Sequence, residues 1–300
     1  PEGRPDRSMV IGFDRSARVL SPMGDPARTT FSGVGASGGT SVAGGIRAAL
    51  KELAAAEPAT PKVEPSRPAD AQPDTPDTAE AARGRRGIVV FSDGLDTDLD
   101  AQLASVAAAR AANVRVTLGL LSPPASTSKA SAARAAGDDG GRGTASLAGK
   151  EAVPAELVEA ILDTGGLVAT LDSTAALDSF ADLVVARGAA SLTDPGSDIG
   201  GPVGPGLTVY TRATDGDDPT QFHTRAAKGQ RVEVTVRALS GNPVRAALSD
   251  VQQLKTFGDR RVEGTAKLTA TLAGAGEVEL EISAAGSGPA VYALTVAASG

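Results

Sequence analysis

The sequence predicts an α/β domain with several parallel strands, followed by a small antiparallel β-sandwich. The first part is indicated by residues 87–92, a short apolar run rich in β-branched residues, which reads as a buried strand. An alanine-rich helical segment and a second apolar run at 114–120 follow, with the spacing of a βαβ unit. The second part is indicated by period-two alternation, clearest at 231–236. The sequence therefore predicts two domains of different architecture.

The α/β part contains further strands and helices that local patterns define. The link from Asp14 to Ser16 is so short that the strands on either side of it should pair antiparallel. Thr40 or Ser41 can cap the first long helix, and Pro154 fits the first turn of a later one. We expect strands at 8–13, 17–20, 87–92, 114–120 and 167–170, and helices at 40–56, 99–112, 154–162 and 173–187.

Composition shifts place the domain boundaries. Two segments rich in Pro, Ala, Ser, Asp and Gly, at about 58–86 and at 122–150, read as disordered insertions. A Pro- and Gly-rich linker at 191–206 separates an α/β domain at 1–190 from a β-sandwich at 207–300. In the sandwich we expect strands at 231–236, 277–282 and 292–296, with weaker candidates at 208–212 and 267–272.

Composition and charge exclude several functions. The 300 residues carry a net charge of −7 and only 3% aromatic residues, so nucleic acid is not an expected partner. Cysteine is absent, which excludes disulfides, thiol catalysis and zinc–thiolate sites. No apolar run is long enough to span a membrane. The chain opens on Pro1 without a signal peptide, so we expect residues to precede it in the parent protein.

Thr40 and Asp93 are the candidate metal ligands. Both residues follow predicted strand or loop ends at one rim of the parallel sheet. A hydroxyl and a carboxylate are hard oxygen ligands that suit Mg²⁺, Mn²⁺ or Ca²⁺. Each residue also has a purely structural explanation: Thr40 can cap a helix, and Asp93 can be an acid that follows a strand.

The order of the elements over residues 1–187 resembles a bacterial-type von Willebrand factor A domain. The segment from Gly38 to Ile46 resembles that family's Gly-Gly-Thr helix start, and Ile88 to Asp96 resembles its fourth strand and Asp-Gly loop. The resemblance implies a doubly wound, mostly parallel, Rossmann-like sheet. It also implies a metal-ion-dependent adhesion site, in which Thr40 and Asp93 supply two of the three ligand loops.

The first ligand loop of that family, Asp-x-Ser-x-Ser, is missing. Asp14 begins a similar segment, but that segment lacks the final serine and lies too close to Thr40 to leave room for a strand and helix. We therefore expect the first strand, helix and loop to lie upstream of Pro1, and a metal site that is incomplete in this chain and binds weakly or not at all.

The second domain resembles a pre-peptidase C-terminal β-sandwich over residues 206–296. The turn from Gly229 to Val232 and the closing strand at Tyr292 are the best matches. Modules of this type accompany secreted or envelope proteins and are not catalytic. The resemblance therefore implies a secreted or cell-envelope location.

Three other sequence features give weaker evidence for a function. The loop from Gly33 to Gly38 fits the dinucleotide fingerprint G-x-G-x-x-G, but no clear strand ends just before it. His223, the only histidine, has neither a cysteine nor a second histidine to complete a site. The acids at Asp96, Asp98 and Asp100 read as solvated charge at a helix start.

The expected function is metal-dependent binding of a protein ligand outside the cytoplasm, without catalysis. A carboxylate of the partner would complete the coordination of the ion. Two alternatives stay open: a nucleotide-dependent α/β enzyme that uses the loop from Gly33 to Gly38, and a structural envelope module without a working metal site.

Overall fold

The computed structural model describes residues 7–30, 41–56, 86–121, 153–189, 200–213 and 219–299. The chain divides into two compact units. Unit 1 comprises residues 1–90 and 95–116, and unit 2 comprises residues 91–94 and 117–300. The predicted boundaries at residues 190 and 206 do not follow this division and stay a prediction.

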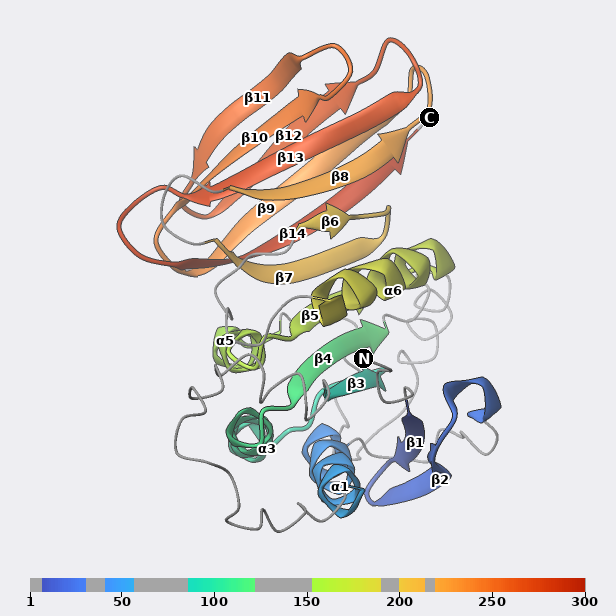
Figure 1. Ribbon diagram of the computed structural model, residues 1–300. Helices are drawn as coiled ribbons and strands as arrows, with labels where there is room; N and C mark the ends of the chain where they lie inside the picture. Colours follow the sequence, from blue (N-terminus) through green and yellow to red (C-terminus); the bar gives the residue numbers. More distant parts are fainter. Residues whose placement is uncertain are drawn as a thin grey trace, which may run out of the picture. The chain divides into compact units, whose positions relative to one another are not determined.

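Unit 1 contains a β-hairpin and two long helices (Figure 1). Strands β1 (Ser8–Phe13) and β2 (Ala17–Gly24) pair antiparallel, as the short link between them predicts. Asp14 closes this turn because its Oδ1 accepts a hydrogen bond of 2.8 Å from the Ser16 amide. A 3₁₀ turn, η1 (Pro26–Arg28), follows the hairpin.

Helix α1 (Val42–Ala55) buries a stripe of small and β-branched side chains. This stripe faces both α3 (Leu99–Ala111) and the hairpin. Gly45 is required at the hairpin contact, because a Cβ there would lie 2.9 Å from Cδ1 of Phe13. The predicted helix therefore forms, and the Val-Ala-Gly-Gly-Ile start gives it a close-packed face.

The remaining strands and helices of the predicted α/β part lie near their expected positions. They are β3 (Gly87–Ser92), β4 (Arg115–Leu121), α5 (Ala155–Leu162), β5 (Leu167–Leu171) and α6 (Thr174–Ala189). Strands β4 and β5 pair parallel, with Leu118 opposite Val168, so the segment from β4 through α5 to β5 forms a βαβ unit.

Nine further strands occur in the part of unit 2 that the structure describes. They are β6 (Gly201–Pro202), β7 (Leu207–Ala213), β8 (Thr220–Ala226), β9 (Arg231–Gly241), β10 (Val244–Asp250), β11 (Lys255–Val262), β12 (Thr265–Thr271), β13 (Gly276–Ala284) and β14 (Ala290–Ser299). One sheet has the order β11-β10-β13-β8-β6, and a second has the order β12-β9-β14-β7-β5-β4-β3. Strand β6 lies within the predicted linker and pairs parallel with β8.

Alternating side chains of the two sheets form one hydrophobic core. In β10 the inward residues are Val244, Ala246 and Leu248, each fully buried, and the residues between them face outward. The largest side chains of this core are Tyr292, Phe180 of α6 and Phe222. The period-two prediction for the C-terminal part is therefore confirmed, and the C-terminal strands form a β-sandwich.

The predicted doubly wound, mostly parallel α/β fold is wrong. The described part of the chain contains more strand than helix, and the larger sheet is mixed. Strand β5 pairs antiparallel with β7, so that Ala169 lies opposite Val209. Because a buried edge of β5 must find a hydrogen-bonding partner, β7 joins the strands predicted for the first domain to the sheet of the second. Among the described helices, none is long and apolar enough to cross a membrane.

Candidate functional site

Asp93 lies directly after β3, with its side chain exposed to solvent. The turn that carries it is held locally, because Ser92 Oγ donates a 2.6 Å hydrogen bond to the carbonyl oxygen of Gly94. In the described part of the chain no hydrogen bond or ion pair engages the Asp93 carboxylate. Thr40, its predicted companion, lies outside the described residues, so the pairing of the two stays a prediction.

Asp96 is the carboxylate that contacts the N-terminus of α1. Its Oδ1 accepts a 2.8 Å hydrogen bond from the Val42 amide, and its Oδ2 accepts a 3.0 Å hydrogen bond from the Ala43 amide. Gln102 donates a further 3.0 Å hydrogen bond to the Asp96 carbonyl oxygen. The Asp96 side chain therefore closes the first turn of a helix that begins 54 residues earlier in the chain.

This contact is missing from the sequence prediction, which treated Asp96 as solvated charge. The N-terminal end of a helix carries partial positive charge, because its first amide groups have no partner within the helix. Helix α1 has no acidic residue in its first turn. That deficit is the signal that could have indicated a carboxylate from elsewhere in the chain. Ser41, one of the two predicted caps, accepts a 3.1 Å hydrogen bond from the Gly44 amide.

Asp98 and Asp100 take the roles expected for acids at a helix start. Asp98 is the N-cap of α3, and its Oδ1 accepts a 2.9 Å hydrogen bond from the Ala101 amide. Asp100 lies exposed in the first turn of the same helix. The segment from Asp93 to Asp100 thus contains two carboxylates that cap helices, Asp96 and Asp98, and two exposed ones without a partner in the described chain, Asp93 and Asp100.

The chemistry available at Asp93 is that of one exposed hard-oxygen donor. No group of three or more His, Asp or Glu side chains that could hold a metal ion occurs among the described residues. A carboxylate alone can supply one ligand to Mg²⁺, an ion that keeps several waters and uses one or two protein carboxylates. Asp93 is compatible with such an ion, provided that the other ligands come from Thr40, water or a partner.

The other two candidates of the sequence prediction gain no support from the geometry. The loop from Gly33 to Gly38 lies outside the described residues. His223 lies on β8, as expected, with a half-exposed side chain opposite Glu279 of β13. No serine or cysteine nucleophile is placed beside it by the strand register.

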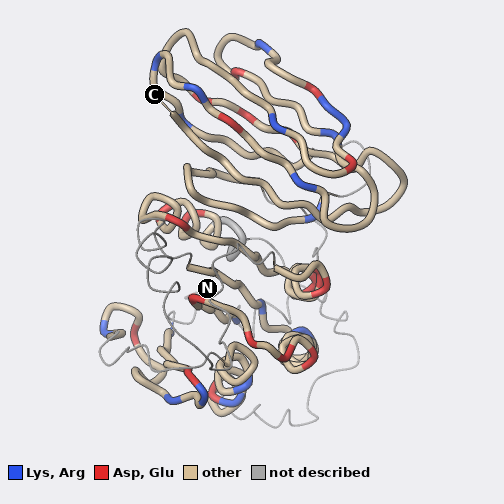
Figure 2. The backbone as a smooth tube through the Cα atoms, turned by 180° about the vertical axis from the view of Figure 1, so that it is seen from behind, with Lys and Arg blue, Asp and Glu red and all other residues tan. Residues whose placement is uncertain are grey.

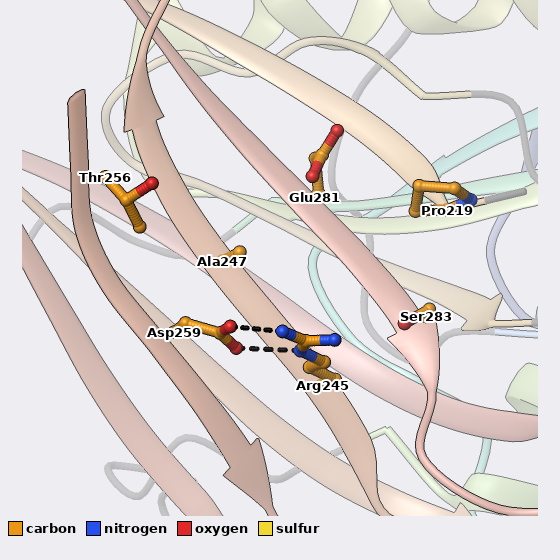
Figure 3. A pocket seen from close by; sticks show the side chains of 7 residues that line it. All are labelled: Pro219, Arg245, Ala247, Thr256, Asp259, Glu281 and Ser283. Atoms are coloured by element: carbon orange, nitrogen blue, oxygen red, sulfur yellow. Dashed lines mark hydrogen bonds and ion pairs between the residues drawn. The ribbon is translucent and has the colours of Figure 1, made fainter. Parts of the chain in front are cut away.

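A shallow hollow of about 380 Å³ lies on the outer face of the five-stranded sheet (Figure 3). Its charged residues are Arg245, Asp259 and Glu281, and Ala247 forms part of its floor. The Arg245 guanidinium binds Asp259 through two hydrogen bonds, one of them 2.9 Å long from Nε to Oδ1. This hydrogen-bonded cation lowers the pKa of Asp259. Arg245 therefore already has an anionic partner within the protein.

Lys or Arg positions and Asp or Glu positions both occur along the strands of the β-sandwich (Figure 2). On β13 the acids Glu277, Glu279 and Glu281 point outward, opposite Arg225, His223 and Gln221 of β8. Opposite charges on neighbouring strands stabilise a solvated sheet face. We assign no binding role to this face.

No family model matches the chain, and no curated protein matches it. Among solved structures, the chain is similar to the pre-peptidase C-terminal domain of collagenase from Bacillus anthracis, with 16% identity and a TM-score of 0.28 over 33% of this chain and 95% of that one. It is also similar to PliG of Aeromonas hydrophila, a periplasmic inhibitor of g-type lysozyme, with 15% identity and a TM-score of 0.27 over 34% of this chain and 96% of that one. TM-scores this low do not establish a shared fold.

Proposed function

We propose that this chain is a non-catalytic, protein-binding module that acts outside the cytoplasm, and that Asp93 binds its partner through a divalent cation. The observation that supports this proposal best is the state of the Asp93 carboxylate. It is exposed directly after β3 and has no partner among the described residues, whereas Asp96 and Asp98 cap helices.

The cation would be Mg²⁺, Mn²⁺ or Ca²⁺, because the available donors are hard oxygens. When bound, the ion supplies a positive charge that attracts a carboxylate of the partner. Asp93 contributes one ligand and the Thr40 hydroxyl a second, and water or the partner fills the other positions. Asp96 positions the segment rather than binding the ion, because α1 amides occupy both of its carboxylate oxygens.

The extracytoplasmic location rests on the C-terminal β-sandwich. Its strands from β7 to β14 include the segments that resemble a pre-peptidase C-terminal module, at the turn from Gly229 to Val232 and at Tyr292. Modules of that type accompany secreted and envelope proteins. The absence of cysteine from the whole chain is compatible with either side of a membrane.

Differential scanning fluorimetry with MgCl₂, MnCl₂ and CaCl₂ tests the cation. Because only two of the three ligand loops are present, we expect the intact chain to bind the ion weakly and to gain a small amount of thermal stability at high ion concentrations. An ion that binds only the folded state stabilises it by mass action. Asp93→Ala should abolish this gain and Thr40→Val should reduce it. Asp100→Ala is the matched control, since it removes a nearby exposed acid and should leave the gain unchanged.

Two results contradict the proposed cation site. The first is the absence of any cation-dependent shift in the intact chain, which would favour a structural module. The second is a shift that Asp93→Ala and Asp100→Ala reduce equally, which would indicate non-specific screening of acidic charge. Calorimetric titration with NAD(H) and ATP addresses the remaining alternative, because nucleotide binding would favour an enzyme that uses the loop from Gly33 to Gly38.

A further inference from the structure

The turn between β10 and β11 presents a leucine to solvent. Leu254 has 90% of its surface exposed, the largest exposed fraction among the large apolar side chains of the described residues. Val251, at the start of the same turn, is 44% exposed. Isolated exposed leucines are common on protein surfaces, so exposure alone indicates nothing.

The backbone of Leu254 is unusual for its residue type. Its φ of +51° lies in the left-handed region, and Asn113, with a φ of +52°, is the other described non-glycine residue there. Asparagine tolerates this conformation, and glycine adopts it without a steric penalty. A leucine is strained there, because its Cβ crowds the following carbonyl oxygen. Folding alone would favour glycine or asparagine at position 254.

A buried carboxylate holds this turn in one shape. Asp250 is only 4% exposed, and its Oδ1 accepts hydrogen bonds from the amides of Gln252 at 2.9 Å and Gln253 at 3.0 Å. The amide of Val251 donates to the carbonyl oxygen of Glu277 on β13. Leu254 is therefore displayed on a pre-organised turn, which lowers the entropy cost of a contact made there.

Two neighbouring turns extend the surface around Leu254. The turn at 227–230 bonds to the turn at 272–275 through the Gly229 amide and the Leu272 carbonyl oxygen, 2.9 Å apart. Gly276 begins the next strand beside Gln252. These turns lie at the end of the sandwich where Figure 1 places the C-terminus. The exposed residues of these turns and of the strand starts that follow them are Ala227, Lys228, Gly229, Arg231, Val251, Gln252, Gln253, Leu254, Lys255, Ala273 and Ala275.

The charge of this surface differs from that of the chain. Its exposed charged side chains are Lys228, Arg231 and Lys255, and Glu277 beside Val251 is half-exposed, whereas the whole chain has a net charge of −7. Lys255 keeps its ammonium group 5.2 Å from the centre of the Phe257 ring, beside the turn. Basic positions beside the C-terminus at this end are visible in Figure 2. The surface thus combines one protruding apolar side chain with a cationic rim.

We propose that this end of the sandwich is a second protein-binding surface, in which Leu254 inserts into an apolar pocket that carries carboxylates at its rim. The protruding leucine supplies the apolar anchor, and the two lysines supply charge complementarity at the rim. Strain at an exposed, pre-organised residue is the pattern of a site selected for contact. This contact is separate from the cation at Asp93 and does not depend on it.

A protein partner fits this surface better than a lipid bilayer. Side chains that anchor proteins at the membrane interface are typically Trp, Tyr or Phe, and the three turns expose none of them. A single leucine also provides too little apolar area for stable insertion into a bilayer. In a protein pocket the same side chain is completely desolvated, which makes one residue sufficient as an anchor.

Selection of displayed peptides of random sequence against the intact chain tests this proposal. Peptides that also bind the Leu254→Ser variant are removed by counter-selection. We expect a family that combines large apolar residues with Asp or Glu, whose affinity falls about 10- to 100-fold in Leu254→Ser, the loss expected for one buried leucine. Leu177→Ser on α6 is the matched control, because Leu177 is an exposed leucine (41%) on an ordinary helix. The selected peptides should bind this variant within about twofold of their affinity for the unchanged chain.

Three results would overturn the proposal. The first is that no selected peptide family depends on Leu254. The second is that sedimentation velocity shows self-association of the chain which Leu254→Ser removes. The third is that the chain binds phosphatidylserine–phosphatidylcholine vesicles and Leu254→Ser abolishes this binding. The Leu254→Gly variant adds an independent readout. It should raise Tm by about 2 to 4 °C through release of backbone strain, while it weakens peptide binding as much as Leu254→Ser does. A lower Tm would assign Leu254 to folding and contradict the proposal.

Discussion

Two aspartates secure two loops of this protein in different ways. Asp96 accepts amides of a helix that begins 54 residues earlier, whereas Asp250 accepts the amides two and three residues after itself. The first contact joins two distant segments of unit 1, and the second fixes the shape of a single turn in unit 2. A long-range cap should therefore influence the stability of a whole unit, while a local cap should influence mainly its own turn.

The largest expected effect is that of Asp96→Ala. The substitution removes two hydrogen bonds to a charged acceptor and leaves the positive end of α1 without an anion, so we expect a loss of about 2 to 4 kcal/mol in the unfolding free energy of unit 1. Urea denaturation gives the total, and hydrogen exchange at Val42 and Ala43 locates the loss. Asp93→Ala is the control, because its exposed side chain should change stability by less than about 0.5 kcal/mol. Equal losses in both variants would contradict the comparison.

The contrast between the two aspartates also explains how far the sequence could predict this molecule. Strands and helices follow from apolar periodicity, which is a local property, and β3, α1 and the strands of the sandwich lie close to their predicted positions. The exposed position of Asp93 after β3 also follows from local pattern. The partner of Asp96 does not, because nothing in the residues around Asp96 specifies a helix 54 residues away.

The error in fold class has the same physical origin. A strand pattern states that β5 is buried, but it does not state which strand covers its edge. The antiparallel pairing of β5 with β7 is a long-range choice, made by residues on either side of the predicted linker. That pairing turned a predicted parallel sheet into a mixed one. Thr40 lies outside the described ranges, so the pairing of Thr40 and Asp93 as metal ligands stays a prediction.

Asp250→Ala should have a smaller effect, confined to its turn. The carboxylate is buried and accepts two backbone amides, so its removal should reduce the unfolding free energy of unit 2 by about 1 to 2 kcal/mol. Hydrogen exchange should accelerate at Gln252 and Gln253, while the amides of α1 keep their protection. Asp250→Asn retains one acceptor oxygen and should lose about half as much. Loss of protection in α1 would show that this cap is not local.

A third carboxylate, that of Asp163, should contribute less to stability than a backbone cap and more than a fully exposed ion pair. Asp163 accepts a 2.8 Å hydrogen bond from Arg212 of β7, and the two side chains are 33% and 21% exposed. Partial exposure weakens the pair through solvent screening, so we expect Asp163→Asn to cost about 0.5 to 1 kcal/mol. A double-mutant cycle with Arg212→Ala measures the coupling between the two side chains. Coupling as large as the loss in Asp96→Ala would contradict the ranking of backbone caps above side-chain pairs.

The smallest effect is expected at Glu233, which lies on the outer face of β9 with its partner on β12. Lys267 donates a 2.6 Å hydrogen bond to Glu233 Oε1, and this bond lowers the pKa of the Glu233 carboxyl. A lowered folded-state pKa stabilises the protein above the unfolded pKa, and the contribution disappears as the pH falls through the folded pKa. Carboxyl titration by NMR should therefore give Glu233 a pKa below its usual range, and Lys267→Ala should raise it. Because the pair is exposed, Lys267→Ala should leave stability at neutral pH nearly unchanged, in contrast to Asp96→Ala. An unchanged Glu233 pKa in that variant would mean that the cross-strand bond is not formed in solution.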